Sequence, residues 1–185
     1  MKIIVAMTGA TGSILGIRLL EALRESGVET HLVMSEWAEK TMQIETSYQP
    51  ADVKKMASHV YAADNQASRI SSGSFRVDGM VIVPCSMKTL AAIRIGFADN
   101  LITRAADVIL KERKKLVILP RELPLNSIHI ENMLTLSHAG AVILPPMLTF
   151  YNKPVTLNDA VNHVVARTMD QFGIENELTK RWLSH

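Results

Sequence analysis

Two residues of opposite charge, Arg121 and Glu122, follow directly after an aliphatic run in the segment LVILPRELPLN. A guanidinium can bind phosphate through two parallel hydrogen bonds, and a carboxylate can transfer a proton. Because Pro120 takes the chain out of the predicted strand, both side chains can turn toward the same end of the sheet. The alternative is a plain surface ion pair, which would contribute almost nothing to stability.

A glycine-rich turn, TGATGSILG, follows the first aliphatic run and carries glycines at positions 9, 12 and 16. Such a strand-to-helix turn presents free backbone N–H groups and the positive end of a helix, which favour a phosphate. The segment lacks the P-loop and G-x-G-x-x-G patterns, and no tyrosine has the lysine four residues on that a short-chain dehydrogenase needs. Nucleotide-type binding therefore stands beside a purely structural interpretation, in which Gly9 and Gly12 only permit a tight turn.

The segment CSMKT is a second candidate anion site, because it opens a helix and offers Ser86, Lys88 and Thr89. An anion at a helix N-terminus gains about 0.3–1 kcal/mol when exposed. A helix-capping Ser86 beside a solvated Lys88 is an equally open alternative. For Cys85, a small buried apolar residue is favoured over a nucleophile, because no histidine stands near it in the sequence.

Arg104 and Lys111 are seven residues apart in the segment ITRAADVILKERK, so both project from one face of a helix. With Asp107 between them they can form a string of salt bridges worth about 0.3–0.5 kcal/mol per pair. The intervening alanine, valine, isoleucine and leucine residues indicate a largely buried helix, on which two cations favour an anionic ligand.

Composition narrows the class of protein. The 185 residues are 48% hydrophobic and 21% charged, with a net charge of +2 that is scattered along the chain, which argues against nucleic-acid binding. The single cysteine and the lack of an apolar run of about 20 residues predict a cytoplasmic protein without a membrane segment. The six histidines show no ligand spacing, so we expect no metal site.

The elements that must position these residues alternate along the chain. A βαβ unit is predicted over residues 2–35, and further aliphatic runs follow at GMVIVPCS, KLVILPRE and AVILPPM, with helical patterns between them. This alternation predicts one α/β domain over residues 1–185: a doubly wound, Rossmann/flavodoxin-like, mostly parallel sheet with helices on both faces. Residues 46–77 look like a helix-and-loop excursion over the sheet edge. Residues from about 172 to 185 look like a C-terminal tail that needs a docking surface, for which Trp182 is a candidate.

Six blocks in this order, MTGATG, SSGSF, PCSMKTLA, RAADVILKERKKLVILPRE, IHIENMLTL and FYNKP, resemble the UbiX/Pad-type flavin prenyltransferases over essentially the whole chain. The segments SEWA and DQFG are similar to members that accompany hydroxyaryl-acid decarboxylases. The resemblance implies transfer of a dimethylallyl group from dimethylallyl phosphate to N5 and C6 of reduced FMN. The prenylated FMN would serve a UbiD-type partner decarboxylase. The resemblance also implies a homo-oligomer, usually a dodecamer, whose sites are completed by neighbouring subunits without a metal.

The same resemblance assigns roles to residues of this sequence. It implies that the flavin is held by Gly9, Ala10, Thr11, Ser35, Ser86, Met87, Lys88, Thr89 and Arg121. It implies that the prenyl phosphate is bound by Arg104, Lys111, Tyr151 and Arg167, of which Arg104 and Lys111 also act in catalysis. The acidic residues near the reacting centre would be Glu45 and Glu122.

Two other functions are compatible with the sequence. One is a non-catalytic subunit that binds FMN and delivers it to a hydroxyaryl-acid decarboxylase. The retention of both acidic residues and of the cations argues against it, because storage requires no proton transfer. The other is direct decarboxylation of an aromatic acid by this chain alone, for which we expect no activity.

Overall fold

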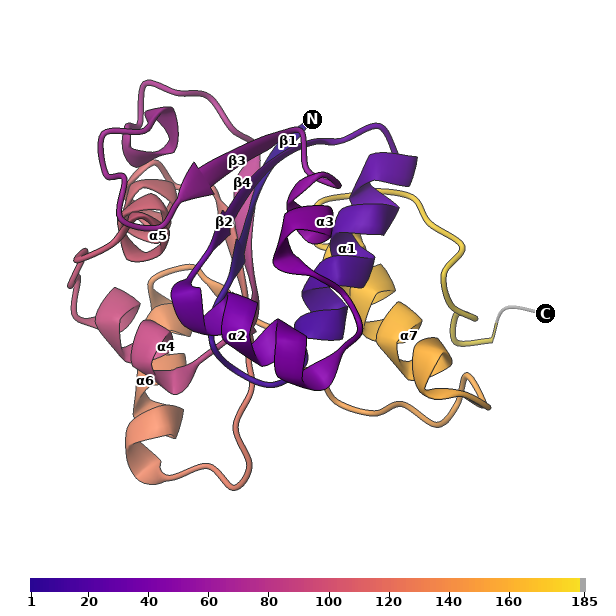
Figure 1. Cartoon of the computed structure of the whole chain (residues 1–185). Helices are drawn as coiled ribbons and strands as arrows, with labels where there is room; N and C mark the ends of the chain where they lie inside the picture. The colour runs from indigo at the N-terminus through magenta and orange to yellow at the C-terminus, as the bar shows by residue number, and fades with distance from the viewer. Residues whose placement is uncertain (184–185) are drawn as a thin grey trace.

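A six-stranded parallel sheet forms the centre of the computed structural model, which describes residues 1–183 (Figure 1). Its strands are β1 (Lys2–Met7), β2 (Glu29–Met34), β3 (His59–Ala62), β4 (Gly79–Cys85), β5 (Lys115–Pro120) and β6 (Val142–Ile143). They are ordered β3-β2-β1-β4-β5-β6, and every neighbouring pair is parallel. The strand order reverses between β1 and β4, the place at which open α/β sheets bind ligands.

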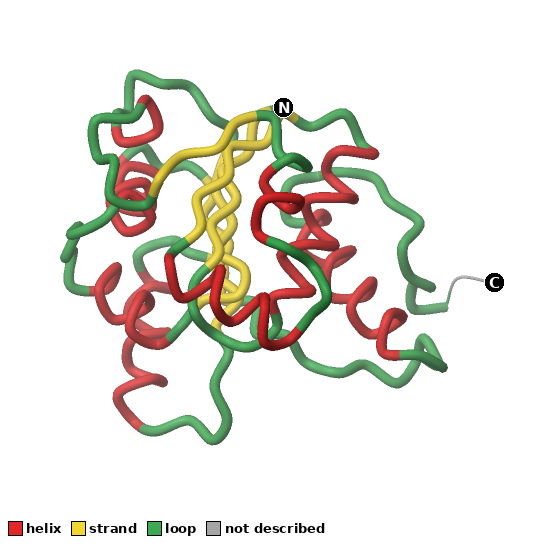
Figure 2. Tube along the Cα trace, in the orientation of Figure 1, coloured by secondary structure: helices red, strands yellow, loops and turns green. Residues whose placement is uncertain are grey.

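Helices cover both faces of the sheet, as the predicted doubly wound fold requires (Figure 2). The helices are α1 (Ser13–Glu25), α2 (Glu36–Glu45), α3 (Pro50–Lys54), α4 (Met87–Arg94), α5 (Leu101–Lys111), α6 (Ser127–His138) and α7 (Leu157–Asp170), with a 3₁₀ helix η1 (Arg69–Ser71). One face carries α1, α2, α3 and α7, and the other carries α4, α5 and α6. Among the described residues, none of the helices has the length and apolar character needed to cross a membrane.

Alternate residues of each strand enter two separate hydrophobic cores. In β1, Ile3 and Val5 pack with α1 and α7, whereas Ile4 and Ala6 pack with α4, α5 and α6. Successive side chains of a strand point to opposite faces, so a strand covered on both sides must be apolar throughout. This explains the unbroken aliphatic runs and confirms the predicted fold class.

Two strands differ from the sequence prediction. The polar stretch 46–77, expected to be a helix and loops, also contains the edge strand β3, whose four residues are mostly exposed and show no apolar alternation. Conversely, the predicted strand AVILPPM is paired only at Val142 and Ile143. Pro145 and Pro146 carry no N–H group, so they cannot continue the ladder.

The C-terminal segment docks against α7 and the core beside it. Phe172, Ile174 and Leu178 pack on the α1–α7 core, and Arg181 donates two hydrogen bonds of 2.6 and 2.8 Å to the carboxylate of Asp170. Trp182, the expected docking residue, makes an edge contact with a tyrosine ring but stays 68% exposed. The last two residues of the predicted tail, Ser184 and His185, lie outside the described residues.

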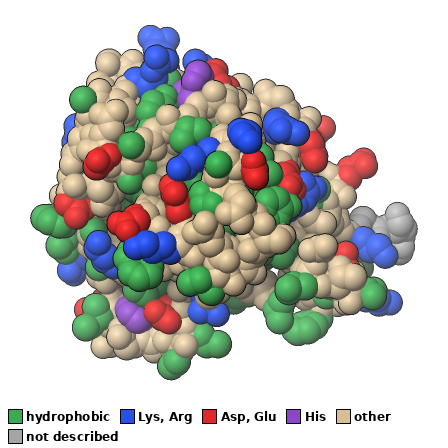
Figure 3. Space-filling view, viewed as in Figure 1, with side chains coloured by type: hydrophobic (Ala, Val, Ile, Leu, Met, Phe, Trp, Pro, Cys, Tyr) green, Lys and Arg blue, Asp and Glu red, His purple; other side chains and the backbone are tan. Residues whose placement is uncertain are grey.

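Charged side chains are interspersed over the surface. On the face seen in Figure 3, lysine and arginine alternate with aspartate and glutamate, and no continuous basic area is present on that face. This pattern agrees with the small net charge of +2.

The packing of α1 on the sheet depends on Gly16. A Cβ atom at this position would lie 2.7 Å from the carbonyl oxygen of Val83 and 2.7 Å from Cε of Met7. We expect Gly16→Ala to lower the free energy of unfolding by about 1–3 kcal/mol, because a backbone carbonyl of the central sheet cannot move aside.

Urea unfolding followed by circular dichroism measures this change. Arg24→Ala, at an exposed position of the same helix, is the control and should stay within about 0.5 kcal/mol of the unchanged protein. Equal stability of Gly16→Ala and the unchanged protein would contradict the close packing.

Candidate functional site

A cavity of about 760 Å³ opens at the carboxyl ends of β1, β2 and β4, next to the reversal of strand order. Five of the residues predicted to hold the flavin line this cavity: Gly9, Ser35, Ser86, Lys88 and Thr89. These residues come from three different strand-to-helix connections. The topology therefore brings together the predicted residues that follow β1, β2 and β4.

Two helices begin at this cavity, and serines cap both of them. The Oγ atom of Ser35 accepts a hydrogen bond from the backbone N–H of Ala38 at the start of α2 (3.1 Å). The Oγ atom of Ser86 accepts one from the N–H of Thr89 at the start of α4 (3.3 Å). Ser86 is thus a helix cap, as one interpretation of the sequence held, and it also lines the cavity. The positive end of α4 and Lys88 favour an anionic group, whereas the first turn of α2 carries Glu36, which also lines the cavity.

Thr8 sets the spacing between the ends of β1 and β4. Its buried hydroxyl donates to the carbonyl of Pro84 (2.9 Å) and accepts from the N–H of Ser86 (2.8 Å). One side chain therefore satisfies both backbone groups at the point where the sheet separates. The position of Ser86 at the cavity follows from this pair of bonds.

Part of the cavity lining is apolar. Trp37, Ile95 and Phe97 line it, and all three side chains are more than half exposed. Gly9 lets α2 approach closely, because a Cβ atom there would lie 2.4 Å from Cβ of Trp37. These apolar side chains can pack against one face of a flat ring, while the end of α4 favours an anionic group. The residues present therefore fit a ligand that combines a planar ring with a phosphate, as FMN does.

Sequence reasoning missed these apolar residues. Trp37 stands two positions after Ser35, within the first turn of a helix that opens at the strand ends. That position was the available signal, because side chains of the first helical turn face the same rim as the cap. Ile95 and Phe97 follow α4 and carry no comparable signal.

The glycine turn after β1 holds a carboxylate of the protein itself. Oε2 of Glu45, at the end of α2, accepts hydrogen bonds from the N–H groups of Gly12 (2.9 Å) and Ser13 (3.0 Å). These N–H groups open α1 and are the ones that a phosphate would use at this turn. Gly12 has a φ of 101°, a left-handed conformation that favours glycine. In this structure Glu45 neutralises the positive end of α1.

The hydrogen bonds at this turn change the acidity of Glu45. Burial acts to raise its pKa, but bonds from the Thr11 hydroxyl and from the backbone of Ser13 and Gly12 outweigh burial, so the pKa lies below its ordinary value. Glu45 is therefore a carboxylate at neutral pH, and in this arrangement it accepts hydrogen bonds.

Arg121 and Glu122 follow β5 and are both exposed. The N–H of Arg121 donates to the carbonyl of Cys85 (3.1 Å), which fixes the backbone beside the end of β4. Within residues 1–183 neither side chain has an ion-pair partner, so the two charges do not form the surface pair that was the alternative. Arg121 lines a smaller cavity of about 240 Å³ together with Thr11 and apolar residues of α1, α7 and the 146–148 loop.

Of the other two predicted flavin residues, one is buried and one is partly buried. Ala10 is buried, and its N–H donates to the carbonyl of Thr8 (2.9 Å). Met87 is the first residue of α4 and packs against the core on the α4–α6 side.

Arg104 and Lys111 lie on α5 against the 71–74 loop. Nε of Arg104 donates to the carbonyl of Ser71 (3.2 Å), and its Nη1 donates to Asp107 (2.7 Å). Lys111 pairs with its neighbour Glu112 rather than with Asp107. The first salt bridge of the predicted string is present and the second is not.

Within one chain, β5 separates Lys111 from Glu122. Lys111 precedes the first residue of β5 and Glu122 follows its last, so the two lie near opposite ends of a six-residue strand. Such a strand is about 17–20 Å long. One copy of the chain therefore does not bring this lysine and this glutamate to the same reacting centre.

Tyr151 and Arg167 both lie near His163 and the C-terminal segment. The ring of Tyr151 makes edge contacts with His163 (5.7 Å between centroids) and Trp182 (5.2 Å), and Arg167 stands one helical turn after His163 on α7. Nη1 of Arg167 donates to Asp170 at 2.6 Å. These two predicted phosphate residues form a group apart from the α5 cations.

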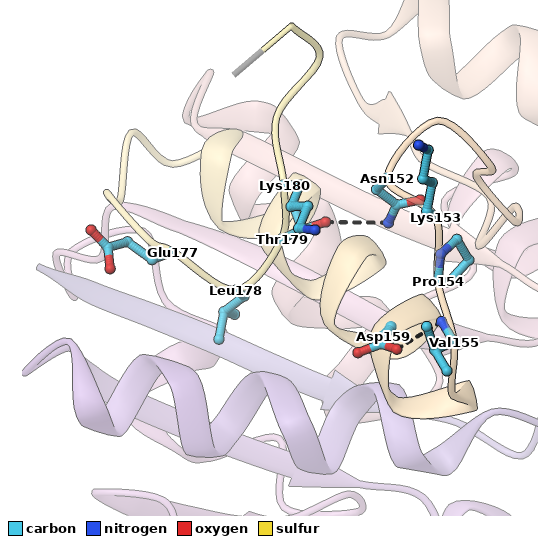
Figure 4. Close-up of a pocket in the computed structure, with 9 residues that line it drawn as sticks. All are labelled: Asn152, Lys153, Pro154, Val155, Asp159, Glu177, Leu178, Thr179 and Lys180. Atoms are coloured by element: carbon cyan, nitrogen blue, oxygen red, sulfur yellow. Dashed lines mark hydrogen bonds between the residues drawn. The ribbon is translucent and has the colours of Figure 1, made fainter. Parts of the chain in front are cut away.

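A hollow of about 410 Å³ lies between the 152–155 loop, α7 and the C-terminal segment (Figure 4). Asn152 Nδ2 donates to Oγ1 of Thr179 (3.3 Å), and the N–H of Val155 donates to Asp159 (2.9 Å). None of the predicted site residues lines this hollow. Its polar groups tie the C-terminal segment and the loop to α7.

Cys85 ends β4 inside the protein and faces the α4–α6 core. Burial raises the pKa of its thiol far above the usual range, so the thiolate is not available at neutral pH. This agrees with its interpretation as a small buried apolar residue.

Comparisons with known proteins place this site among flavoproteins. The family model described as Flavoprotein matches residues 1–170. The chain is 59% identical to a probable UbiX-like flavin prenyltransferase of Escherichia coli O157:H7, over 98% of this chain and 93% of that protein. It is 54% identical to the mitochondrial flavin prenyltransferase PAD1 of Saccharomyces cerevisiae, over 98% of this chain and 75% of that protein.

Two solved structures share the whole fold. A dodecameric FMN-dependent UbiX-like decarboxylase from Escherichia coli O157:H7 superposes with a TM-score of 0.97 at 58% identity, over 100% of both chains. AnUbiX (PadA1), in complex with FMN and dimethylallyl pyrophosphate, superposes with a TM-score of 0.98 at 53% identity, over 100% of this chain and 98% of that one.

The capping role of Glu45 predicts a pH-dependent contribution to stability. Because folding lowers the pKa of Glu45 below its ordinary value of 4.5, its charge stabilises the fold above that value, and the contribution disappears as the pH falls through the lower folded pKa. At pH 7 we expect Glu45→Gln to lower the free energy of unfolding by about 0.3–1 kcal/mol. The difference should disappear as the pH falls through the lowered pKa of Glu45.

Denaturant unfolding at several pH values tests this contribution. Glu175→Gln, at an exposed position in the C-terminal segment, is the matched control and should show no such pH dependence. A Glu45→Gln difference that stays constant from pH 7 to the acid range would show that the charge does not stabilise the turn.

Proposed function

This chain belongs to the Flavoprotein family and, within it, to the UbiX-like flavin prenyltransferases, and from this premise we propose that it transfers a dimethylallyl group to reduced FMN. The observation that carries the proposal is the full-length match to a structure that holds FMN and dimethylallyl pyrophosphate. The cavity at the strand ends supports it, because its anion-binding wall and apolar wall suit the two parts of a flavin nucleotide.

We propose that Gly9, Ser35, Ser86, Lys88 and Thr89 hold FMN in the cavity at the strand ends. The helix ends and Lys88 bind its phosphate or other electron-rich edges, and Trp37 excludes water from one side of the ring. When bound, reduced FMN supplies N5 and C6 as the positions to be alkylated. Arg121 and Thr11, in the adjoining cavity, complete the flavin side.

The departing phosphate needs positive charge, and we propose that Arg104, Lys111 and Arg167 supply it together with the hydroxyl of Tyr151. Preorganised cations stabilise a leaving phosphate in the transition state. Because β5 separates Lys111 from Glu122 in one chain, the complete site combines residues of at least two copies. The dodecameric relative supports such an assembly, and we propose a dodecamer for this chain.

Glu122 is the proposed proton-transfer residue. Its carboxylate is exposed, has no ion-pair partner within residues 1–183, and accepts only the N–H of Leu123 (3.2 Å). It can therefore protonate the departing phosphate or take the proton released when the ring carbon is alkylated. Glu45 acts from the neighbouring turn, where it orients the backbone N–H groups of α1.

The product and its destination complete the proposal. Prenylated FMN is made for a UbiD-type decarboxylase that acts on hydroxyaryl acids. The donor is dimethylallyl phosphate, and the reaction takes place in the cytoplasm.

Purified protein given reduced FMN and dimethylallyl phosphate under anaerobic conditions should yield a flavin heavier by one prenyl unit. The reason is that the chain holds both a flavin cavity and the cations that a leaving phosphate needs. Mass spectrometry of the released flavin measures the product, and a sample without the prenyl donor is the control. An unchanged flavin mass with FMN bound would indicate the non-catalytic delivery subunit instead.

We expect Glu122→Gln to lower the prenylation rate by about 10²–10⁴-fold, because the amide cannot transfer a proton. FMN affinity should remain within about twofold of the unchanged protein, since the cavity does not include this residue. Rates from the flavin mass assay and FMN affinity from fluorescence titration give the two quantities. Glu131→Gln, exposed on α6, is the control, and full activity of Glu122→Gln would rule out the assigned role.

A further inference from the structure

Three side chains that can ligate a metal lie close together at the amino ends of the strands. The cavity proposed to bind the flavin lies at the other end of the sheet, beyond the carboxyl ends of the strands. Glu29 and His31 belong to the first half of β2, and His59 is the first residue of β3. One ligand atom from each lies within 4.8 Å of the others. In a parallel sheet all amino ends lie on one side and all carboxyl ends on the other. The length of the strands therefore separates this cluster from the proposed FMN site.

The parallel register of β2 and β3 produces this cluster. His31 and His59 are directly paired across the two strands, and their rings stack with centroids 4.7 Å apart. The two histidines are 28 positions apart in the chain, which matches no metal-ligand spacing. The expectation of no metal site rested on sequence spacing, which does not include cross-strand pairing.

The distances within the cluster suit a tetrahedral ion. Oε1 of Glu29 lies 3.3 Å from Nε2 of His31 and 3.3 Å from Nε2 of His59. Donor atoms that sit about 2.0–2.1 Å from a tetrahedral zinc ion are about 3.4 Å apart. The two rings are stacked with only 19° between their planes, so an ion can lie in the plane of both only after one ring rotates, and the exposed His59 is the side chain with room to do so.

His31 has a buried nitrogen available for a ligand. The side chain is fully buried, and Nε2 makes no hydrogen bond of acceptable geometry although Glu29 lies within ion-pair distance. Nδ1 lies 2.9 Å from the hydroxyl of Tyr61. When Nδ1 carries the proton and donates to this hydroxyl, Nε2 presents its lone pair, as metal-binding histidines generally do.

Neighbouring groups hold the three side chains in positions from which they can bind a metal ion. Nζ of Lys2 lies 3.3 Å from the other carboxylate oxygen of Glu29 and leaves Oε1 facing the histidines. Phe75 packs edge-on against His31 at 5.2 Å and closes one side.

We propose that Glu29, His31 and His59 form a zinc-class metal site, with water or another small ligand at the fourth position. Two imidazoles and one carboxylate favour a borderline ion such as Zn²⁺ over Mg²⁺ or Ca²⁺, which prefer oxygen ligands. Tyr61 is a positioning residue, since it fixes the ring and tautomer of His31 rather than touching the metal.

Zinc titration of the full-length, chelator-treated protein tests the site without any prenyl donor, so its result is independent of the proposed transferase activity. We expect one zinc ion per chain by isothermal titration calorimetry and by metal analysis after gel filtration. Cobalt(II), used as a spectroscopic probe, should give the visible absorption of a four-coordinate ion. Failure to bind zinc in a one-to-one ratio would overturn the proposal.

Substitutions distinguish this site from zinc bound elsewhere. His59→Ala changes an exposed residue, so the fold should persist, and we expect zinc affinity to fall at least 10-fold. Tyr61→Phe keeps the ring but removes the hydroxyl, and should weaken zinc by about 10–100-fold. His138→Ala, an exposed histidine on α6, is the matched control and should bind zinc as the unchanged protein does. Equal affinities of His59→Ala and His138→Ala would place any bound zinc outside the cluster and refute the proposal.

Discussion

Burial of both faces of the parallel sheet is the constraint on which the rest of the molecule depends. A strand that is apolar throughout has no position for a charged or hydrogen-bonding side chain, so such groups can gather only at the strand ends. At the carboxyl ends, the hydroxyl of Thr8 joins the backbone of β1 and β4 and sets the position of Ser86. At the amino ends, Glu29 and His31 of β2 and His59 of the edge strand β3 lie close together. The amino ends and the carboxyl ends of the strands thus carry different kinds of polar side chains.

The helix N-termini at the carboxyl edge differ in how they are neutralised. The ends of α2 and α4 are capped by neutral serine hydroxyls, whereas the end of α1 is capped by the carboxylate of Glu45. A second anion at α1 would meet this like charge, and an anion at α2 would meet Glu36 and Glu39 of its first turn, whereas the first turn of α4 carries no acidic residue. On the proposal that the cavity between β1, β2 and β4 holds FMN, this difference favours its phosphate at the end of α4 rather than at the glycine turn.

Much of this arrangement could be predicted from the sequence, because strand-to-helix junctions are local features. Aliphatic runs located the strand ends and left a helix-capping Ser86 as one alternative, and the topology then required the residues at these strand ends to share one rim. Glu45 at the glycine turn and the pairing of His31 with His59 depend on contacts between distant segments. Contacts of this kind leave no pattern of hydrophobic periodicity or residue spacing in the sequence. The short edge strand β3 was missed for a related reason, since its exposed side chains give no apolar alternation.

The length of β5 has a consequence for how defects in this protein would combine. On the proposal that the site is shared between copies, a change at Lys111 damages the site of a neighbouring subunit, whereas a change at Glu122 damages the site of the subunit that carries it. A cell that makes both defective forms would assemble mixed oligomers in which some interfaces join two intact halves. Because six strand residues separate the two positions, two inactive alleles of one gene, one changed at Lys111 and one at Glu122, should complement each other in a mixed oligomer.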